Sequence, residues 1–399
     1  MSGLEELMKI KNQFVKFALL DPMPKYADEN TAWQGAPSIA RTKKGRLFVT
    51  KLTGGIYEPD PRNADVLIYS DDNGETWSDP VLALESRPEE FIRVSDLELW
   101  VDPDGALHLF WNECPYPKGL EMPTYEQKVD MENDSKYHSL EAMAYLCEAI
   151  CKDPDADDLV IEDLRVIFKK VMRNHPFVTK TGRWLYPTAK TEPCDFYEFY
   201  YSDDKGKTLE SVKIFGRAPG RAFDEPAFFY TFDGKLAVVV RTTPPMYKIM
   251  YSEDDAVTWT APENFYGASS QRPCIGNLEN GDILFIPSIH PEKRNGFKLM
   301  LSQNGGEFVE KMILDDRERV SYAEFVEDDK YVYIAYDRER NNKIKKSYVT
   351  GLSEAAKEIL FAKIPKSALE KGEVTPDTVR AKVISKAGIN SLVNKFTVN

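Results

Sequence analysis

A turn motif that recurs along the chain is the strongest constraint on its fold. Residues 69–77 read Tyr-Ser-Asp-Asp-Asn-Gly-Glu-Thr-Trp and contain a complete Asp-box, Ser-x-Asp-x-Gly-x-Thr-Trp. In such a turn the Ser, Asp and Thr side chains hydrogen-bond the backbone, the glycine supplies a positive φ, and the tryptophan packs under the turn. The motif therefore predicts a tight hairpin turn between two strands.

Three further copies of the motif follow. Residues 202–208 keep it with Leu209 in place of the tryptophan, residues 252–259 lack only the glycine, and residues 302–308 are a degenerate copy. The serines that open these three copies are 50 residues apart, twice in succession. A fixed period of this size, with strands between the copies, predicts the blades of a β-propeller. Asp-boxes hold turns on the outer rim, so they predict the fold and not the chemistry.

Hairpin patterns between the Asp-boxes predict six blades. Alternating apolar residues around Gly-containing turns are typical of such hairpins. The predicted strand regions, in chain order, are 37–50 with 66–69, 97–111, 177–187 with 199–201, 226–241, 272–289, and 321–337 with 357–363 as an outer strand. We also expect a strand at 13–19 that joins the last blade and closes the ring, because closure removes free edges. The tail from about 366 to 399 is polar and predicted to be irregular.

The 50-residue period breaks in the second blade. Between residues 121 and 174, apolar residues recur at spacings of three and four, over 139–150 and over 164–172. This spacing predicts two amphipathic helices. We interpret 121–174 as a helical insertion, which is either a surface decoration or a lid or oligomer contact.

Length and charge limit the classes of function. The chain has 399 residues, 42% of them apolar and 12% aromatic, which is ample for one large core. Closed all-β folds run long as one unit, so we predict a single domain over residues 1–399. The net charge is −13 and no basic stripe is visible, which argues against a nucleic-acid partner. An anionic ligand would need a local cluster of arginines.

The cysteines and the N-terminus predict a reduced, cytoplasmic chain, or a secreted one if a signal has been removed. The five cysteines are Cys114, Cys147, Cys151, Cys194 and Cys274, an odd number without a Cys-x-x-Cys pair. No second Cys or His pair completes a metal site near residues 147 and 151, and no phosphate loop or Rossmann pattern occurs. We therefore expect no metal and no cofactor. The first 20 residues are too charged for a signal peptide, and no apolar run reaches about 18 residues.

Polar residues on the predicted inner strands are the candidates for chemistry. The pair Asp224-Glu225 precedes one such strand, and Arg241 ends the run Leu-Ala-Val-Val-Val-Arg. Arg294 precedes the strand before the fourth Asp-box, and Tyr322 follows Ser321. An arginine after several apolar strand residues is costly to bury without an anion. A core carboxylate or a bound ligand can supply that anion.

With these residues the chain resembles the sialidase (neuraminidase) superfamily of six-bladed propellers, in its bacterial BNR-repeat branch. The resemblance covers most of residues 33–363 outside the insertion. Glu225, followed by the turn and strand at 233–236 and by Arg241, is similar to the family's Glu-strand-turn-strand-Arg unit. Arg294 resembles its later carboxylate-binding arginine, and Tyr322 its nucleophilic tyrosine.

The resemblance implies a role for each of these residues. Tyr322 is expected to be the nucleophile or transition-state stabiliser and Glu225 its base. Arg241 and Arg294 are expected to bind a substrate carboxylate in forked hydrogen bonds. A sialoside already carries a carboxylate at its anomeric carbon, which would repel a carboxylate nucleophile, and sialidases use a tyrosine instead.

A general acid is also required for the leaving oxygen. In the family it is an aspartate between the first inner hairpin and the first Asp-box, and here the matching loop, 54–60, offers Asp60 and Glu58. The family opens its first blade with Arg-Ile-Pro, whose arginine completes a triad. This chain instead reads Gln-Gly-Ala-Pro-Ser-Ile over 34–39, and we interpret Arg41 as a strand residue. The departure favours a different sugar as much as sialic acid: a uronic acid, another keto-acid sugar or a deoxysugar.

Other polar residues are candidates for lining the same pocket, although each taken singly is more typical of a surface or blade edge. They are Arg93, Asp96, Asn112, Glu113, His175, Lys190, Glu192, Arg272, His290, Asp337 and Arg338.

Three functions are compatible with the sequence. The first is a sialidase-like glycoside hydrolase that removes a terminal, acidic or deoxy sugar from an oligosaccharide or glycoside. The second is a propeller-type polysaccharide lyase with Tyr322 or a histidine as base. The third is a carbohydrate-binding propeller without catalysis, because fold does not determine function.

Overall fold

The computed structural model describes residues 24–55, 58, 60, 62–117, 119, 143–189, 196–216, 223–242, 246–267, 271–290, 293–338, 357–373, 379 and 381–388. The predicted strand at 13–19 lies outside these residues. Apart from three short 3₁₀ turns, at Pro24–Tyr26, Asp28–Asn30 and Pro88–Glu90, and the helix α2 (Lys366–Lys371), the described elements are strands.

Six antiparallel sheets make up the fold, which confirms the predicted six-bladed β-propeller. In the first sheet β1 (Gln34–Gly35), β3 (Leu47–Thr53), β4 (Ala64–Ser70) and β5 (Leu82–Glu85) are neighbours in that order, and β2 (Ile39–Arg41) also pairs with β3. The second sheet has the order β6 (Ile92–Val101), β7 (Leu107–Pro115), β8 (Tyr145–Cys151), β9 (Ile161–Phe168).

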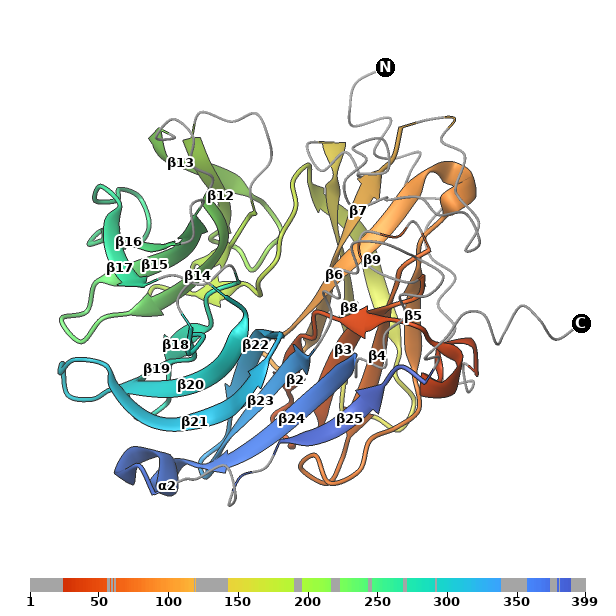
Figure 1. Ribbon diagram of the computed structural model, residues 1–399. Helices are drawn as coiled ribbons and strands as arrows, with labels where there is room; N and C mark the ends of the chain where they lie inside the picture. Colours follow the sequence, from red (N-terminus) through yellow and green to blue (C-terminus); the bar gives the residue numbers. More distant parts are fainter. Residues whose placement is uncertain are drawn as a thin grey trace, which may run out of the picture. The chain divides into compact units, whose positions relative to one another are not determined.

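The remaining sheets are four-stranded meanders in which consecutive strands are neighbours (Figure 1). The third is β10 (Phe177–Val178), β11 (Trp184–Tyr186), β12 (Phe196–Ser202) and β13 (Glu210–Gly216). The fourth is β14 (Phe223–Tyr230), β15 (Leu236–Thr242), β16 (Met246–Ser252) and β17 (Glu263–Gly267). The fifth is β18 (Ile275–Asn277), β19 (Ile283–Phe285), β20 (Asn295–Ser302) and β21 (Val309–Glu318). The sixth is β22 (Val320–Glu327), β23 (Tyr331–Arg338), β24 (Glu358–Pro365) and β25 (Lys382–Lys386).

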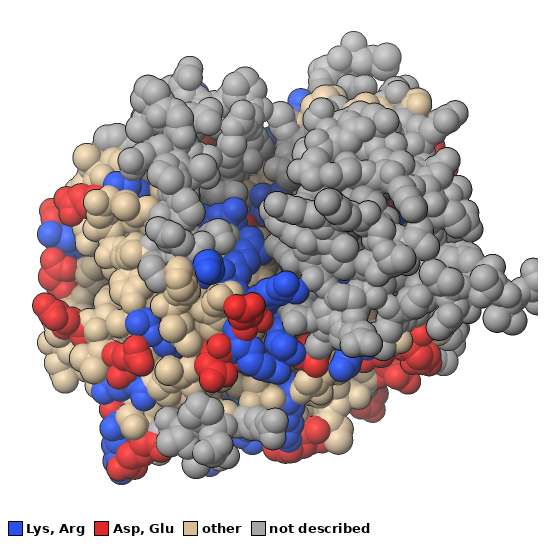
Figure 2. Space-filling view, in the orientation of Figure 1, with Lys and Arg blue, Asp and Glu red and all other residues tan. Residues whose placement is uncertain are grey.

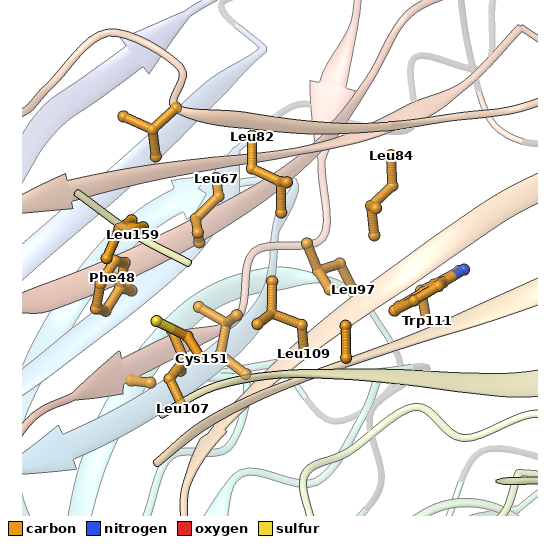
Figure 3. Close-up of a cluster of buried hydrophobic side chains, with 14 of the residues drawn as sticks. Phe48, Leu67, Leu82, Leu84, Leu97, Leu107, Leu109, Trp111, Cys151 and Leu159 are labelled. Atoms are coloured by element: carbon orange, nitrogen blue, oxygen red, sulfur yellow. The ribbon is translucent and has the colours of Figure 1, made fainter. Parts of the chain in front are cut away.

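The chain divides into two compact units. Unit 1 comprises residues 1–170, 336–360 and 383–399, and unit 2 comprises residues 171–335 and 361–382. In unit 1 a buried apolar cluster joins the first two sheets, and Figure 3 shows leucines of β4 to β7 gathered with Phe48, Trp111 and Leu159. In unit 2 two aromatic-rich clusters fill the space between neighbouring sheets, one around Phe199 and Phe228 and the other around Tyr247 and Phe285.

The Asp-box turns form as the sequence predicts. In the first copy the Ser70 hydroxyl accepts a hydrogen bond from the backbone N–H of Gly74 (2.9 Å), and Asp72 accepts one from the N–H of Thr76 (2.9 Å). The second and third copies repeat both bonds, at 2.7 to 3.0 Å. Ala256, which replaces the glycine of the third copy, keeps a left-handed φ of 71°. The turn geometry therefore survives the loss of its glycine.

The prediction of a helical insertion was wrong for the residues that the structure describes. The two segments read as helices are the strands β8 and β9, which complete the second blade. Strand β8 is buried on both faces, so its run of apolar residues resembles one face of a buried helix, and spacing alone does not distinguish the two. Residues 120–142 lie outside the description, and an oligomer contact through this segment stays a prediction.

The prediction of an irregular tail from residue 366 was also wrong in part. The helix α2 follows β24 directly, and β25 forms the outermost strand of the sixth sheet. Strand β24, predicted to be the outer strand, is therefore third in the order. Among the described residues no helix is long and apolar enough to span a membrane, and no group of three or more His, Cys, Asp or Glu side chains could hold a metal ion.

Candidate active site

Two of the predicted catalytic residues share an uncommon backbone conformation on the first strand of their sheets. Glu225 on β14 has a φ of 50° and Tyr322 on β22 has a φ of 54°. The pairing of β14 with β15 shifts register between Asp224 and Ala227, which marks a β-bulge at Glu225. A left-handed non-glycine residue costs about 1–2 kcal/mol, and bulges often re-aim a side chain next to an active site.

Glu225 is held between an arginine and the tyrosine. Its side chain is 2% exposed, and Oε2 accepts a hydrogen bond from Arg241 Nη1 at 2.7 Å. Arg241 reaches it because Asp224 and Arg241 are opposite each other in the β14–β15 ladder. The other oxygen, Oε1, lies 3.4 Å from the Tyr322 hydroxyl. This separation is longer than a strong O–H···O bond but places the phenol next to a carboxylate.

Two further arginines surround the tyrosine. Arg294 Nη2 lies 3.4 Å from the Tyr322 hydroxyl, and its guanidinium carbon is 5.0 Å from the ring centroid. The guanidinium carbon of Arg272 is 5.9 Å from the same ring. Both distances are within the range of cation–π attraction.

A second carboxylate lies beside this group. Glu324 accepts a hydrogen bond from Arg272 Nη2 at 3.1 Å, and both side chains are buried. Arg272 Nη1 also donates to the backbone oxygen of Arg173 at 3.0 Å. The Nε2 atom of His175 is 3.8 Å from Glu324, while its Nδ1 contacts the backbone oxygen of Pro176 at 2.9 Å. We call Tyr322, Glu225, Arg173, Arg241, Arg272, Arg294, Glu324 and His175 the arginine cluster.

The environment of the cluster shifts the pKa values of its two central groups in opposite directions. Burial alone would raise the pKa of Glu225, but Arg241, Arg173, Arg294 and Arg272 outweigh it, so the pKa lies below the usual range. Burial and the charge of Glu225 raise the pKa of Tyr322, and Arg294, Arg241 and Arg173 oppose this only in part. Near neutral pH the cluster therefore contains an ionised carboxylate next to a protonated phenol.

This arrangement can perform two chemical tasks. The ionised Glu225 can accept the proton of Tyr322 and so activate the phenol oxygen as a nucleophile. The guanidinium groups can bind an anionic substituent of a ligand, since arginine matches carboxylate geometry. Although the net charge of the chain is −13, lysine and arginine side chains gather in one area of the face in Figure 2.

The two candidates for the general acid lie in unit 1 and are both ion-paired. Asp60 is fully buried, and its two oxygens accept hydrogen bonds from Nε and Nη2 of Arg62, each at 2.7 Å. In this conformation Asp60 stabilises its own loop. Glu58 instead pairs with Arg93 Nη2 at 3.0 Å and stays partly exposed. Of the two, Glu58 is the more exposed.

Other predicted residues of unit 1 make further polar contacts, some of them to the same groups. Arg93 Nε contacts the Asn63 side chain at 3.2 Å, and Glu113 is paired with Arg87 at 2.8 Å. Asp96, with a φ of 57°, lies at a register shift of β6 and contacts Asn112 at 3.4 Å. Thus Asp96 occupies in β6 the same kind of position that Glu225 occupies in β14.

The first strand of unit 1 lacks the triad arginine, as the sequence indicates. Ala36 is the residue with positive φ there (48°), and its backbone N–H donates to Asp337 Oδ2 at 2.7 Å. Arg338 pairs with Glu358 at 3.3 Å. Asp337 therefore accepts a hydrogen bond from the backbone of the first blade.

The remaining predicted residues do not belong to the arginine cluster. His290 is exposed in the turn between β19 and β20. Arg41 ends the strand β2, as expected. Lys190 and Glu192 lie outside the described residues.

Two members of the arginine cluster were missed by sequence reasoning. Glu324 follows Tyr322 by two residues, and alternate residues of a strand share a face, so that spacing could have indicated it. Arg173 precedes His175 in a segment that we read as helical. No signal in the sequence connects Arg173 with Glu225.

Comparison with known proteins finds one matching family and several solved structures with a similar fold. The pattern that defines BNR repeat-like domains matches residues 58–334. A solved structure of an intramolecular trans-sialidase from leech, in complex with 2,7-anhydro-Neu5Ac, has a TM-score of 0.66 at 15% identity, over 93% of this chain and 73% of that one. An intramolecular trans-sialidase from Ruminococcus gnavus, in complex with oseltamivir carboxylate, has a TM-score of 0.63 at 14% identity, over 88% and 98%.

A protein of unknown function from Dyadobacter fermentans is similar to the same degree, with a TM-score of 0.60 at 18% identity, over 82% of this chain and 94% of that one. No curated protein matches the sequence. At these identities the solved structures support a common fold.

Proposed function

Because this chain belongs to the family of BNR repeat-like domains, we propose that it is a glycoside hydrolase of the sialidase-like type. Its substrate is a glycoside or oligosaccharide that ends in a sugar carrying a carboxylate. The observation that carries the proposal is the pair of contacts made by the Glu225 carboxylate. One oxygen accepts a hydrogen bond from Arg241, and the other faces the Tyr322 hydroxyl. The two intramolecular trans-sialidases among the structural neighbours support a reaction of the sialidase-like type.

The proposed reaction proceeds in two steps. The Tyr322 oxygen attacks the anomeric carbon as its proton passes to Glu225, and the bond from that carbon to the leaving oxygen breaks. The leaving oxygen takes a proton from a general acid. Water then attacks the same carbon and gives a proton to the deprotonated general acid, the bond to Tyr322 breaks, and Tyr322 regains its proton from Glu225.

The arginines account for the preference for an acidic sugar. Arg294 lies next to the phenol oxygen and Arg241 next to its base, so a carboxylate on the reacting carbon would lie among guanidinium groups. They would offset the repulsion between that carboxylate and Glu225. The family's triad arginine is missing from residues 34–39. We therefore propose a uronic acid or a keto-acid sugar, with sialic acid as one of the candidates.

A panel of aryl glycosides tests the proposal. Purified protein is incubated with the aryl glycosides of sialic acid, glucuronic acid, rhamnose and fucose, and release of the phenol is followed. We expect release from an acidic sugar, and a loss of at least about 100-fold in Tyr322→Phe and Glu225→Gln. Tyr331→Phe, on the neighbouring strand β23, is the matched control and should keep the parent rate.

A uronate polymer added to the panel, and a sugar-binding titration of the same three proteins, distinguish the alternatives. A product that absorbs in the ultraviolet, formed from a uronate polymer without uptake of water, would identify a lyase. Saturable sugar binding that is equal in the parent and both variants, without turnover of any substrate, would identify a carbohydrate-binding propeller.

A further inference from the structure

The proposed reaction needs a proton donor for its leaving oxygen, and one histidine of the arginine cluster meets the requirements for that role. The two carboxylates predicted for it, Asp60 and Glu58, belong to unit 1, whereas the arginine cluster belongs to unit 2. Within the cluster Glu225 is ionised and is assigned as the base, so a different group has to hold the proton. An acid and a base that work together need environments that keep their protonation states apart.

His175 lies in the segment directly before strand β10. Its Nδ1 atom is 2.9 Å from the backbone oxygen of Pro176. A carbonyl oxygen can only accept a hydrogen bond, so Nδ1 carries a hydrogen in both charge states of the ring. Nε2 is therefore the atom that gains or loses a proton, because the hydrogen bond at one ring nitrogen sets the role of the other.

A buried carboxylate faces that atom. Nε2 is 3.8 Å from Glu324 Oε1, and the other oxygen of Glu324 accepts a hydrogen bond from Arg272 at 3.1 Å. The guanidinium groups of the cluster repel a positively charged imidazolium, and the nearby carboxylate offsets this repulsion. Glu324 thus allows the ring to hold a proton on Nε2 within a cluster that contains four arginines.

The exposure of His175 distinguishes it from the carboxylates of the cluster. Its side chain is 39% exposed, whereas those of Glu225 and Glu324 are 2% and 5% exposed. In an enzyme that removes a terminal sugar, the rest of the glycoside extends toward solvent, so the leaving oxygen meets its donor at the open side of the site. An imidazole also changes charge between about pH 5 and 8 without perturbation, and can therefore give up a proton and take one back near neutral pH.

We propose that His175 is the general acid of this site, an inference that rests on the proposed hydrolase function. When the bond from the anomeric carbon to the leaving oxygen breaks, that oxygen takes the proton from Nε2, and the ring becomes neutral with its hydrogen on Nδ1. In the second step water attacks the anomeric carbon and gives a proton back to Nε2. The ring then has its starting charge, while Glu225 and Tyr322 exchange their own proton.

Leaving groups of different acidity test the proposal with the full chain. The substrates are two glycosides of the acidic sugar that the parent hydrolyses best, one with dinitrophenol and one with methanol as the leaving group. Dinitrophenol is acidic enough to depart without a proton, whereas methanol departs only with one. We expect His175→Gln to lower kcat/KM at least about 100-fold for the methyl glycoside and less than about fivefold for the dinitrophenyl glycoside.

The pH dependence of methyl glycoside hydrolysis gives a second readout. In the parent, kcat/KM should fall at high pH as the imidazolium is lost, and His175→Gln should lack this fall. Glu324→Gln removes the counter-charge of the ring, so the fall should begin at lower pH. His290→Gln, an exposed histidine in the turn between β19 and β20, is the matched control and should behave as the parent in both measurements.

Histidine NMR of the isotope-labelled parent chain checks the two ring nitrogens without turnover. The signals of His175 are identified by their absence from His175→Gln. We expect a hydrogen on Nδ1 at every pH and titration at Nε2.

Two results would overturn this inference alone. One is an equal loss for both leaving groups in a His175→Gln chain that unfolds at the same denaturant concentration as the parent, which would assign His175 a binding or structural role. The other is a neutral ring that carries its hydrogen on Nε2. If the parent releases neither leaving group from any acidic sugar, the proposed function is wrong and the inference is overturned with it.

Discussion

Single residues in left-handed conformations mark the places where this chain departs from regular strand geometry. Glu225, Tyr322 and Asp96 have φ values of 50°, 54° and 57°. All three lie on the first strand of a sheet, and two of them form the centre of the proposed active site. Such strained positions persist only where the surrounding structure determines them. For Glu225 the surrounding structure is the arginine cluster, in which Arg241 donates a hydrogen bond to the Glu225 carboxylate.

The arginines should control the pH range in which Glu225 acts as a base. Arg241 contributes most to the lowering of the pKa of Glu225. In Arg241→Met the pKa should rise, so the acid limb of the kcat/KM profile should move to higher pH. The measurement is kcat/KM against pH with the best substrate of the panel. Arg319→Met, an exposed residue before β22, is the control, and an unmoved acid limb in Arg241→Met would argue against Glu225 as the base.

Among the elements, the Asp-box is the unit whose stability follows most directly from its local hydrogen bonds. The Ser252 hydroxyl accepts the buried backbone N–H of Ala256 at 3.0 Å. Ser252→Ala leaves that N–H without its partner, so we expect a loss of about 1–3 kcal/mol in the free energy of unfolding. Denaturant unfolding checks this value. Glu253→Gln in the same turn changes an exposed ion pair and should have an effect of less than about 1 kcal/mol.

The second blade contains a buried ionic network across three strands. His108 on β7 lies between Glu148 on β8 (2.7 Å) and Asp102 (3.3 Å), and Arg165 on β9 binds the other oxygen of Glu148. Burial alone would lower the pKa of His108, but the hydrogen bonds and charges of Asp102 and Glu148 outweigh it and raise the pKa. The charged imidazolium therefore stabilises the folded state.

This network predicts how stability depends on pH. Because the folded pKa of His108 lies above its unfolded value, its contribution is complete below about pH 6.5 and is lost as the pH rises through the folded pKa. His108→Gln should remove this part of the fall in the free energy of unfolding. Urea unfolding at pH values from 5.5 to 8.5 measures it, with His290→Gln as the exposed control. Equal pH slopes for His108→Gln and the parent chain would contradict the assignment.

At the scale of the whole molecule, the described thiols report on global unfolding. Cys114, Cys147 and Cys151 in unit 1 and Cys274 in unit 2 are free and buried. Burial also raises the pKa of Cys147, Cys151 and Cys274, which keeps them as unreactive thiols.

We therefore expect these four cysteines to react with a thiol reagent slowly in buffer and rapidly in denaturant. Mass spectrometry of labelled peptides distinguishes the four positions. Fast labelling of any of them in buffer would show that its sheet opens without global unfolding. The free energy of unfolding should also be unchanged by a reducing agent.

The sequence alone determined the fold class because the Asp-box is a local signal. The turn residues of each copy lie within eight positions and bond one another, so three copies at a period of 50 predict blades without knowledge of the contacts between them. Glu225, Arg241 and Tyr322 were predicted from their order along the chain and their resemblance to a family; the structure brings them together, and their catalytic roles stay predictions.

The tertiary structure decided what depends on residues far apart in the chain. Strands β8 and β9 could not be told from helices by the spacing of their apolar residues, and in β8 burial on both faces removes the alternation that identifies a strand. Strand β25 is a strand because it pairs with β24. The bond between Arg272 and Glu324, and the bond between Lys51 and Ser385, join residues 52 and 334 positions apart. Contacts of this kind form through packing, and local sequence carries little information about them.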